Sequence, residues 1–108
     1  MKLPRPKTDG RLSLERSIRE RRTVRRFGSR PLTPEQLGQL LWAAQGVTGS
    51  LGMKRAAPSA GALYPLDVYV VAGGVKGLDA GVHVYRPQGH ELGAGAAGGS
   101  VWVFLAAV

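Results

Sequence analysis

A chain of 108 residues with 44% apolar and 20% charged residues is long enough for one globular domain and too short for two. It has no cysteine, which excludes disulfides, thiolate metal ligands and cysteine nucleophiles and fits a reducing cytoplasm. No apolar run approaches the roughly 20 residues of a membrane-spanning helix, and the first residues lack the apolar core of a signal peptide. We therefore expect one cytoplasmic domain without a membrane segment.

The net charge of +8 is confined to the start of the chain. Residues 1–30 contain eleven Lys or Arg against three acidic residues, whereas residues 31–108 contain four of each sign. This local excess favours one anion-binding site or one basic surface over a protein that is basic throughout.

The first helix is predicted after a polar, proline-containing lead. Residues 1–11 show no periodicity and predict a flexible arm that either lies on the domain or forms a loose end. Ser13 is a suitable N-cap for a helix from Leu14 to about Arg22. Leu14, Ile18 and the aliphatic part of Arg22 share one face, which predicts a weakly amphipathic helix. It ends in an arginine cluster, which also suits the negative end of the helix dipole.

The second helix has the clearest boundary signals in the chain. Thr33 as the N-cap, Pro34 at the first position and Gln36 at the third form a predicted capping box. Gly46 is expected to end the helix in the left-handed conformation. Four apolar residues recur at helical spacing and predict a stripe that faces the core: Leu37, Leu40, Leu41 and Ala44.

From Leu66 onward the hydrophobic period changes from helix to strand. Apolar residues occupy both faces of 66–72, which predicts a strand covered on both sides. A second strand is expected at 81–86, followed by a turn at 87–89 and a short extended segment. After a Gly/Ala-rich link, the apolar run 101–108 predicts a further strand that also needs cover on both faces. The elements together indicate an α+β domain.

Two other patterns do not form a recognisable site. Gly73-Gly74-x-x-Gly77 follows a strand, but the spacing differs from a dinucleotide fingerprint and the glycines lead into another strand. His83 and His90 have no cysteine or carboxylate pair nearby and are interpreted as solvent-facing strand histidines. No Ser-His-Asp set, paired-carboxylate site or P-loop is recognisable, so we predict neither a metal site nor a catalytic residue.

A small, kinked loop leads into the first predicted strand within Ala56–Val71. Its small side chains let backbone N–H and C=O groups approach a flat ligand, while Pro58 and Pro65 reduce its conformational freedom. The same residues are also typical of an ordinary helix-to-strand connection. The loop alone leaves both interpretations open.

Two motifs in order give the chain a resemblance to a known family. The first is R-R-T-V-R-R-F at residues 21–27, and the second is P-S-A-G-A-L-Y-P at residues 58–65. Over about residues 14–108 the chain resembles the FMN-dependent nitroreductase family. The second motif, with G-V-H-V-Y-R at 81–86, is most similar to the SagB-type dehydrogenases, which include azoline oxidases of modified-peptide pathways. The resemblance implies a nitroreductase-like α+β fold, with a mixed or antiparallel sheet flanked by helices.

The resemblance also implies an FMN-dependent oxidoreductase that transfers hydride through flavin N5. Arginine meets a phosphate dianion bidentately and stays charged, and a hydroxyl adds a donor. The phosphate-binding positions would be Arg21, Arg22, Thr23 and Arg25. Along the isoalloxazine would lie Pro58, Ser59, Gly61 and Ala62. Ala62 stands where many members carry Asn, so a side-chain hydrogen bond is lost there, and Tyr64 would bound the substrate pocket.

The resemblance covers only the N-terminal part of the family fold. We expect residues 1–108 to form a single truncated domain without the C-terminal half. It would be a fragment, one half of a protein completed by another chain, or a degenerate copy that no longer binds FMN. In the first two cases a homodimer is expected, because the family places its cofactor between subunits and the chain ends on an uncovered strand. The resemblance further implies a small-molecule or peptide substrate, with NAD(P)H as a candidate electron donor.

A non-catalytic binding module is the alternative function. Basic residues between positions 5 and 30 would then contact nucleic acid or an acidic partner. Nucleic acid is the less favoured partner, because no groove-reading helix or aromatic stacking platform is recognisable. The flavin interpretation, in contrast, requires the arginine cluster and the 58–65 loop to meet, either within one subunit or across a two-fold axis.

Overall fold

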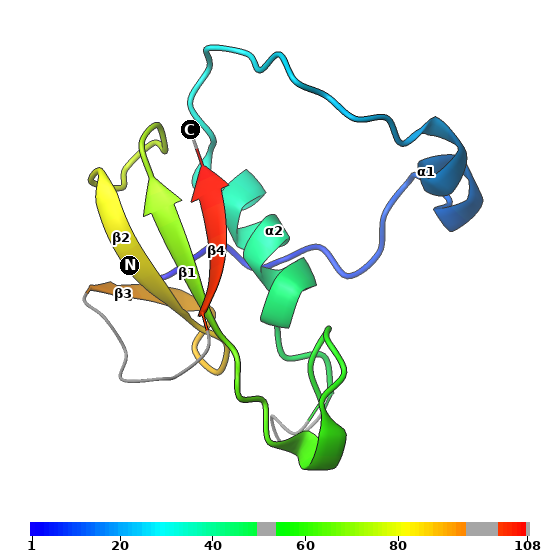
Figure 1. Ribbon diagram of the computed structural model, residues 1–108, viewed down its shortest axis with the longest axis vertical. Helices are drawn as coiled ribbons and strands as arrows, with labels where there is room; N and C mark the ends of the chain where they lie inside the picture. Colours follow the sequence, from blue (N-terminus) through cyan, green and yellow to red (C-terminus); the bar gives the residue numbers. More distant parts are fainter. Residues whose placement is uncertain (50–53, 95–101, 108) are drawn as a thin grey trace.

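The computed structural model describes residues 1–49, 54–94 and 102–107. The strands form one sheet in the order β3-β2-β1-β4, in which β4 runs parallel to β1 and the other neighbours are antiparallel (Figure 1). The predicted α+β class with a mixed sheet is confirmed. No helix among the described residues is long and apolar enough to cross a membrane. The elements are α1 (Leu14–Glu20), α2 (Pro34–Gln45), the 3-10 turn η2 (Ala60–Ala62), β1 (Asp67–Ala72), β2 (Gly81–Arg86), β3 (Glu91–Ala94) and β4 (Trp102–Ala107).

The core lies between α2 and one face of the sheet. Alternate residues of a strand point to the same side, so Val68, Val70 and Ala72 of β1 share the face that packs into this core. They cluster with Leu37 and Leu41 of α2, which are both fully buried. The remaining buried members of the cluster come from the first residues of the chain and from the segments around β2 and β3: Leu3, Val75, Tyr85 and Leu92.

The opposite face of β1 is covered only in part. Tyr69 is buried, whereas 40% of Val71 is exposed. The prediction of cover on both sides therefore holds at Tyr69 and is wrong at Val71. The second strand, β2, has the predicted bounds, and the turn that follows it leads into β3 as expected.

The predicted capping box of α2 is confirmed. The Gln36 N–H donates to Thr33 Oγ1 at 3.2 Å, and the Thr33 N–H donates to Gln36 Oε1 at 3.0 Å. These two bonds satisfy N–H groups that the first turn of a helix leaves without an intrahelical partner.

The buried face of α2 differs from the predicted stripe. Leu37 and Leu41 are buried, but Leu40 is 49% exposed, and Gln45 is buried where Ala44 was expected. The helix contacts the sheet along a narrow line of i, i+4 and i+8 positions, which leaves Leu40 outside it.

The end of α2 also differs from the prediction. Gly46 has φ −64° and ψ 149°, so the expected left-handed cap is wrong. A Cβ atom at this position would lie 2.3 Å from the Trp42 ring. Close approach to Trp42, and not a positive φ, therefore favours glycine here.

The short helix α1 stands apart from the sheet and from α2 (Figure 1). Its predicted N-cap is confirmed, because Ser13 Oγ accepts an N–H of the first turn at 3.2 Å. The helix ends at Glu20, two residues before the predicted end. Leu14 and Ile18 are 71% and 69% exposed, so the expected apolar face packs against nothing described. Two apolar side chains on a seven-residue helix bury too little area to hold it against the domain.

The first residues of the chain lie on the domain. Leu3 is buried and donates its N–H to the turn before β3 at 3.0 Å, and the Leu92 N–H donates to the Met1 carbonyl at 2.8 Å. Further along, the Gln39 side chain of α2 bonds both backbone polar groups of Lys7, at 2.8 and 2.9 Å. Residues 1–7 of the predicted arm therefore lie on the domain.

Candidate functional site

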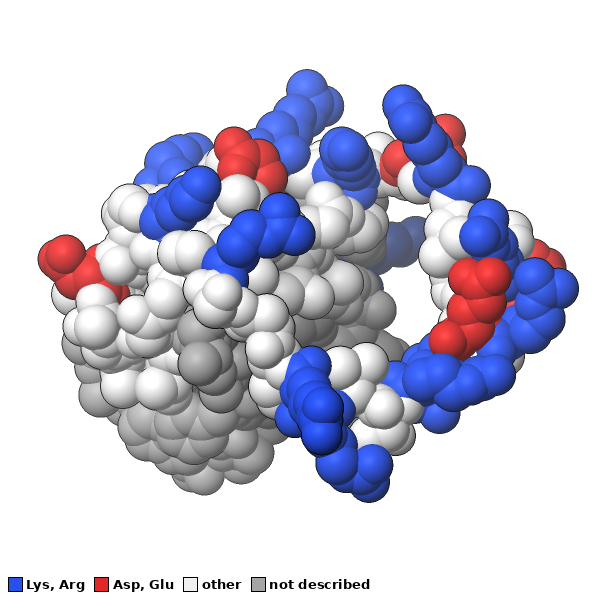
Figure 2. Space-filling model, turned by 90° about the horizontal axis from the view of Figure 1, so that it is seen from above, with Lys and Arg blue, Asp and Glu red and all other residues white. Residues whose placement is uncertain are grey.

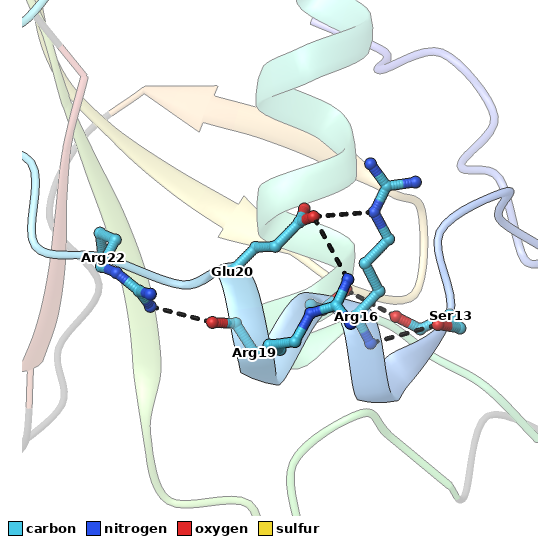
Figure 3. A network of polar contacts seen from close by, with 6 residues as sticks. Ser13, Arg16, Arg19, Glu20 and Arg22 are labelled. Atoms are coloured by element: carbon cyan, nitrogen blue, oxygen red, sulfur yellow. Dashed lines mark hydrogen bonds and ion pairs between the residues drawn. The ribbon is translucent and has the colours of Figure 1, made fainter.

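The predicted phosphate-binding residues lie on an extended segment that follows α1, and all four are exposed: Arg21, Arg22, Thr23 and Arg25. The Arg22 guanidinium donates to the carbonyls of Arg19 and Arg21, at 2.9 and 2.8 Å. Figure 3 shows the first of these bonds at the end of α1. Arg22 therefore supplies partners for carbonyl groups that the helix end leaves unpaired.

The carboxylate nearest in sequence is already engaged. Glu20 accepts from Arg16 at 3.0 Å and lies 3.8 Å from Arg19 (Figure 3). In the part of the chain that the structure describes, no carboxylate lies within ion-pair distance of Arg21, Arg22 or Arg25. Their positive charges are therefore not neutralised by a neighbouring side chain.

Most of the excess positive charge of the sequence lies on the segment that contains α1 and the arginine motif. Every residue from 7 to 31 is exposed. Figure 2 shows many of the Lys and Arg side chains on a band that stands off the body of the molecule and leaves an opening beside it. The positive potential is thus local and attracts an anionic group to this band.

The second set of predicted residues forms a tight, hydrogen-bonded loop around η2. Ser59 Oγ accepts the Tyr64 N–H at 2.8 Å, and the Ser59 carbonyl accepts the Ala62 N–H at 3.2 Å. Gly61, Ala62 and Tyr64 have φ values of 65°, 54° and 44°. Such values are uncommon and strained for Ala and Tyr. With Pro58 exposed at its start, the loop presents main-chain groups in a conformation that its own hydrogen bonds maintain.

The structure does not bring the arginine cluster and this loop together within one chain. The segment after α1 runs to the N-terminal end of α2, whereas the loop lies beyond the C-terminal end (Figure 1). The twelve residues of α2 separate the two ends by about 18 Å. The two sets therefore do not form one pocket within the chain as the structure describes it.

A cavity of about 420 Å³ adjoins the loop. Tyr64 borders it from the loop, Gln45 from the end of α2, and Tyr85 from β2. The Arg55 guanidinium lies over the Tyr64 ring, 4.4 Å from its centroid, which is a cation–π contact. Tyr64, the predicted substrate-pocket residue, therefore lines a cavity beside the loop.

A hydrogen-bonded chain links this cavity to the N-terminal arm. His90 Nε2 lies 2.9 Å from the Pro4 carbonyl, which only accepts, so Nε2 carries the proton. In neutral His90 the other nitrogen, Nδ1, therefore accepts from the Tyr85 hydroxyl at 2.8 Å. Burial raises the pKa of Tyr85 to about 12, although the Arg55 charge opposes this. Burial also lowers the pKa of His90, with the bond to Pro4 acting against it and the Lys2 charge reinforcing it.

The lowered pKa of His90 predicts a pH dependence of stability. The unfolded chain binds a proton at His90 at the ordinary pKa of 6.5, and the folded chain binds it only at lower pH. The contribution of neutral His90 to the free energy of unfolding is therefore fully present above pH 6.5. It is lost as the pH falls from 6.5 toward the lower pKa of His90 in the folded chain. We expect the free energy of unfolding, measured in urea, to fall over this range, and His90→Gln to remove that part of the slope. His83→Gln is the control and should retain it, and an unchanged slope in His90→Gln would contradict the prediction.

Comparison with known proteins places these features in a family. The model of the nitroreductase family matches residues 18–102. The chain belongs to the nitroreductase family. A relative described as "Putative nitroreductase MJ1384", from Methanocaldococcus jannaschii, is 44% identical over 81 residues. The matched part is 75% of this chain and 40% of that protein, so the chain spans less than half of the relative's length.

Two separate groups of residues in this nitroreductase-family chain have the chemistry that a flavin nucleotide requires. The guanidinium groups and the Thr23 hydroxyl of the 21–25 segment are donors of the kind that suits a phosphate dianion, and no described carboxylate competes for the guanidinium groups. The loop at 58–62, exposed except at the half-buried Ser59, supplies main-chain groups in a constrained turn. The two groups lie beyond opposite ends of α2 in one chain (Figure 1).

Apart from Tyr64, sequence reasoning missed the residues that line the cavity of this family member. Gln45 carried a usable signal, because it lies four residues after Leu41 and eight after Leu37, on the buried stripe of α2. Tyr85 lies in a predicted strand but gave no hint of its bond to His90. Arg55 had no local signal, since its partner Tyr64 is brought over by the turn between them.

Proposed function

We propose that this chain forms the flavin-binding part of an FMN-dependent oxidoreductase of the SagB-type dehydrogenase branch. The observation that carries the proposal is that one family match, over residues 18–102, spans both the arginine motif and the 58–65 loop. FMN, when bound, would supply hydride exchange at its N5 atom. We further propose a small-molecule or peptide substrate, NAD(P)H as the electron donor, and a location in the cytoplasm.

The arginine cluster would hold the phosphate end of the cofactor. Arg21 and Arg25 are exposed, and Arg22 is anchored through the carbonyls at the end of α1. A guanidinium donates two parallel hydrogen bonds to a phosphate and keeps its charge at any pH of interest. The Thr23 hydroxyl would add one more donor. These side chains bind and orient; none of them is proposed to move a proton.

The 58–65 loop would support the flat ring system. Pro58, Ser59, Gly61 and Ala62 have small or rigid side chains, so the main chain can lie close to a planar ligand. The Ser59–Tyr64 hydrogen bond holds that main chain in place before the ligand binds, which lowers the entropic cost of binding. Tyr64 would bound the substrate side, where it borders the cavity.

We propose that two chains assemble this site. The arginine cluster of one chain and the loop of the same chain lie beyond opposite ends of α2 (Figure 1). We propose that residues 1–108 act as a single domain and that a homodimer, or a complementing chain, joins the cluster of one chain to the loop of the other. A symmetric dimer would form two equal sites in this way.

The absorption spectrum of the purified chain tests the proposal. We expect a visible flavin band, and FMN as the molecule released when the protein is denatured. The chain should show this after reconstitution with FMN if it is purified without cofactor. A chain that stays colourless after reconstitution, although circular dichroism shows it folded, would contradict the proposed function.

A second candidate function, a non-catalytic basic binding module, is favoured by the exposure of the basic segment. Residues 7–31 are all exposed and α1 has no buried residue, so this segment is available to an acidic partner. Such binding would be lost as salt screens the charges. Salt-sensitive retardation of a nucleic acid in a gel by a flavin-free sample would favour this second function over the first.

A further inference from the structure

The cavity beside the 58–65 loop is lined by charges of both signs. Its volume of about 420 Å³ lies within the range of small-molecule pockets, roughly 300–1,000 Å³. Leu66 and Val84 supply apolar wall. Two guanidinium groups and two carboxylates border the cavity among the described residues, and they belong to Arg55, Asp67, Arg86 and Glu91.

These four charges are not neutralised by the chain itself. In the ranges that the structure describes, the ion pairs are confined to α1, and none of the four side chains makes a hydrogen bond. Arg55 contacts only the uncharged ring of Tyr64. Asp67 and Glu91 are half-buried, so water solvates their carboxylates less completely than it solvates a fully exposed group. A ligand with matching charges would therefore replace solvent that is already reduced.

Arg86 and Glu91 lie directly opposite each other on β2 and β3 but turn apart. Opposite charges at such paired positions usually attract each other across the strands. Here the Arg86 guanidinium lies over Gly93, where an added Cβ atom would stand 2.7 Å from Cζ. The Glu91 carboxylate lies over Gly89, where an added Cβ atom would stand 2.9 Å from Oε1. The ammonium group of Lys2, which bridges to Glu91 through the backbone, donates to the Gly89 carbonyl. The hairpin thus presents a separated positive and negative group.

The balance of charge selects a class of ligand. An anion would be attracted by the two guanidinium groups but repelled by Asp67 and Glu91. A cation would be attracted by these carboxylates but repelled by Arg55 and Arg86. A neutral molecule would leave all four charges without a matching group. A zwitterion, which carries an ammonium and a carboxylate group on one carbon atom, complements both signs and can join the separated pair.

We propose that this cavity binds a zwitterionic α-amino acid with an apolar side chain. The ammonium group of the ligand would lie at Glu91 and its carboxylate at Arg86, so that the ligand bridges the pair that turns apart. The apolar side chain would lie against Leu66 and Val84. The site lies within one chain and uses no residue of the arginine cluster, so it does not depend on the proposed flavin site.

Titration of the flavin-free 108-residue chain with three matched probes tests this proposal. L-phenylalanine carries both charges, hydrocinnamate lacks the ammonium group, and phenethylamine lacks the carboxylate. We expect L-phenylalanine to bind at least about tenfold more tightly than either of the others, as measured by chemical-shift changes in amide NMR spectra. Comparable or tighter binding of a singly charged probe, or no saturable shift with L-phenylalanine, would overturn the proposal. Because no flavin is present, this result is separate from the test of FMN binding.

Two variants locate the charged groups of the ligand. Glu91→Gln should weaken L-phenylalanine binding about tenfold or more but should not weaken hydrocinnamate binding, because hydrocinnamate has no ammonium group. Arg86→Gln should weaken L-phenylalanine binding to a similar degree but should not weaken phenethylamine binding, because phenethylamine has no carboxylate. This crossed pattern distinguishes contact with each charge from a general loss of the cavity.

Asp79→Asn and Lys76→Gln are the matched controls. They remove one charge of each sign from exposed residues that do not line the cavity, so both should bind L-phenylalanine like the unchanged chain. A thermal melt verifies that each variant folds. Arg86 is exposed, so if Glu91→Gln does not fold, Arg86→Gln decides. Unchanged L-phenylalanine affinity in a folded Arg86→Gln chain would overturn the assignment.

Discussion

Replacing Arg22 and Arg25 together with alanine is expected to weaken FMN binding by at least about 100-fold while the chain stays folded. Hydrogen bonds to a charged group contribute about 1.5–3 kcal/mol each, and a tenfold change in affinity is about 1.4 kcal/mol. Both side chains are exposed and lie outside the core. The loss of the Arg22 bonds can fray α1, but α1 buries no residue, so the sheet and α2 should be unaffected. Fluorescence titration with FMN measures the effect.

A matched pair of changes separates phosphate binding from general charge. Arg11→Ala with Arg30→Ala removes the same two charges from the same exposed stretch, outside the motif at residues 21–27. We expect this control to retain FMN affinity within about threefold, because screened charges outside the contact contribute little. Equal losses of FMN affinity in both double variants would show that the general positive charge of this stretch, and not the motif at residues 21–27, accounts for the binding.

The second large effect concerns the core: Leu41→Ala should lower the free energy of unfolding by about 2–5 kcal/mol. Leu41 is fully buried between α2 and β1, so the truncation removes apolar contacts and leaves a cavity. Urea unfolding followed by circular dichroism measures the change, on the assumption of a two-state transition for a domain of this size.

Leu40→Ala is the control on the same helix. Leu40 is half exposed and lies outside the core cluster, so its truncation should lower the free energy of unfolding by about 1 kcal/mol or less. Both changes alter helix propensity alike, which leaves burial as the difference between them. A Leu40→Ala effect as large as that of Leu41→Ala would show that α2 faces the sheet with a different side.

The parts of the fold that depend on neighbouring residues could be predicted from the sequence. Thr33 and Gln36 form their capping box, and β2 begins and ends where its alternating residues indicated, because caps and periods are local properties. The side of α2 that faces the sheet is not local, and Leu40 and Gln45 consequently differ from the expectation. The predicted apolar face of α1 does not pack against the domain for the same reason. The residues of α1 alone do not indicate whether another surface is available to cover that face.

The candidate site shows the same division. The arginine motif and the loop are continuous in sequence, so their residue types and order could be recognised. The two motifs lie beyond opposite ends of α2 (Figure 1). This separation depends on the tertiary structure, so neither motif alone could predict it. The cavity draws Gln45, Arg55, Tyr64 and Tyr85 from four segments, and only packing brings them together.

A mixing experiment tests most directly whether the flavin site is shared between two chains. One variant loses the cluster, by Arg22→Ala with Arg25→Ala, and the other loses the loop, by Ser59→Ala with Gly61→Val; each alone should bind no FMN. If cluster and loop of different chains form each site, half of the dimers in an equal, re-equilibrated mixture are mixed and carry one intact site. The mixture should then recover roughly a quarter of the FMN bound by the unchanged chain. A mixture that forms mixed dimers and recovers no FMN would contradict the shared site.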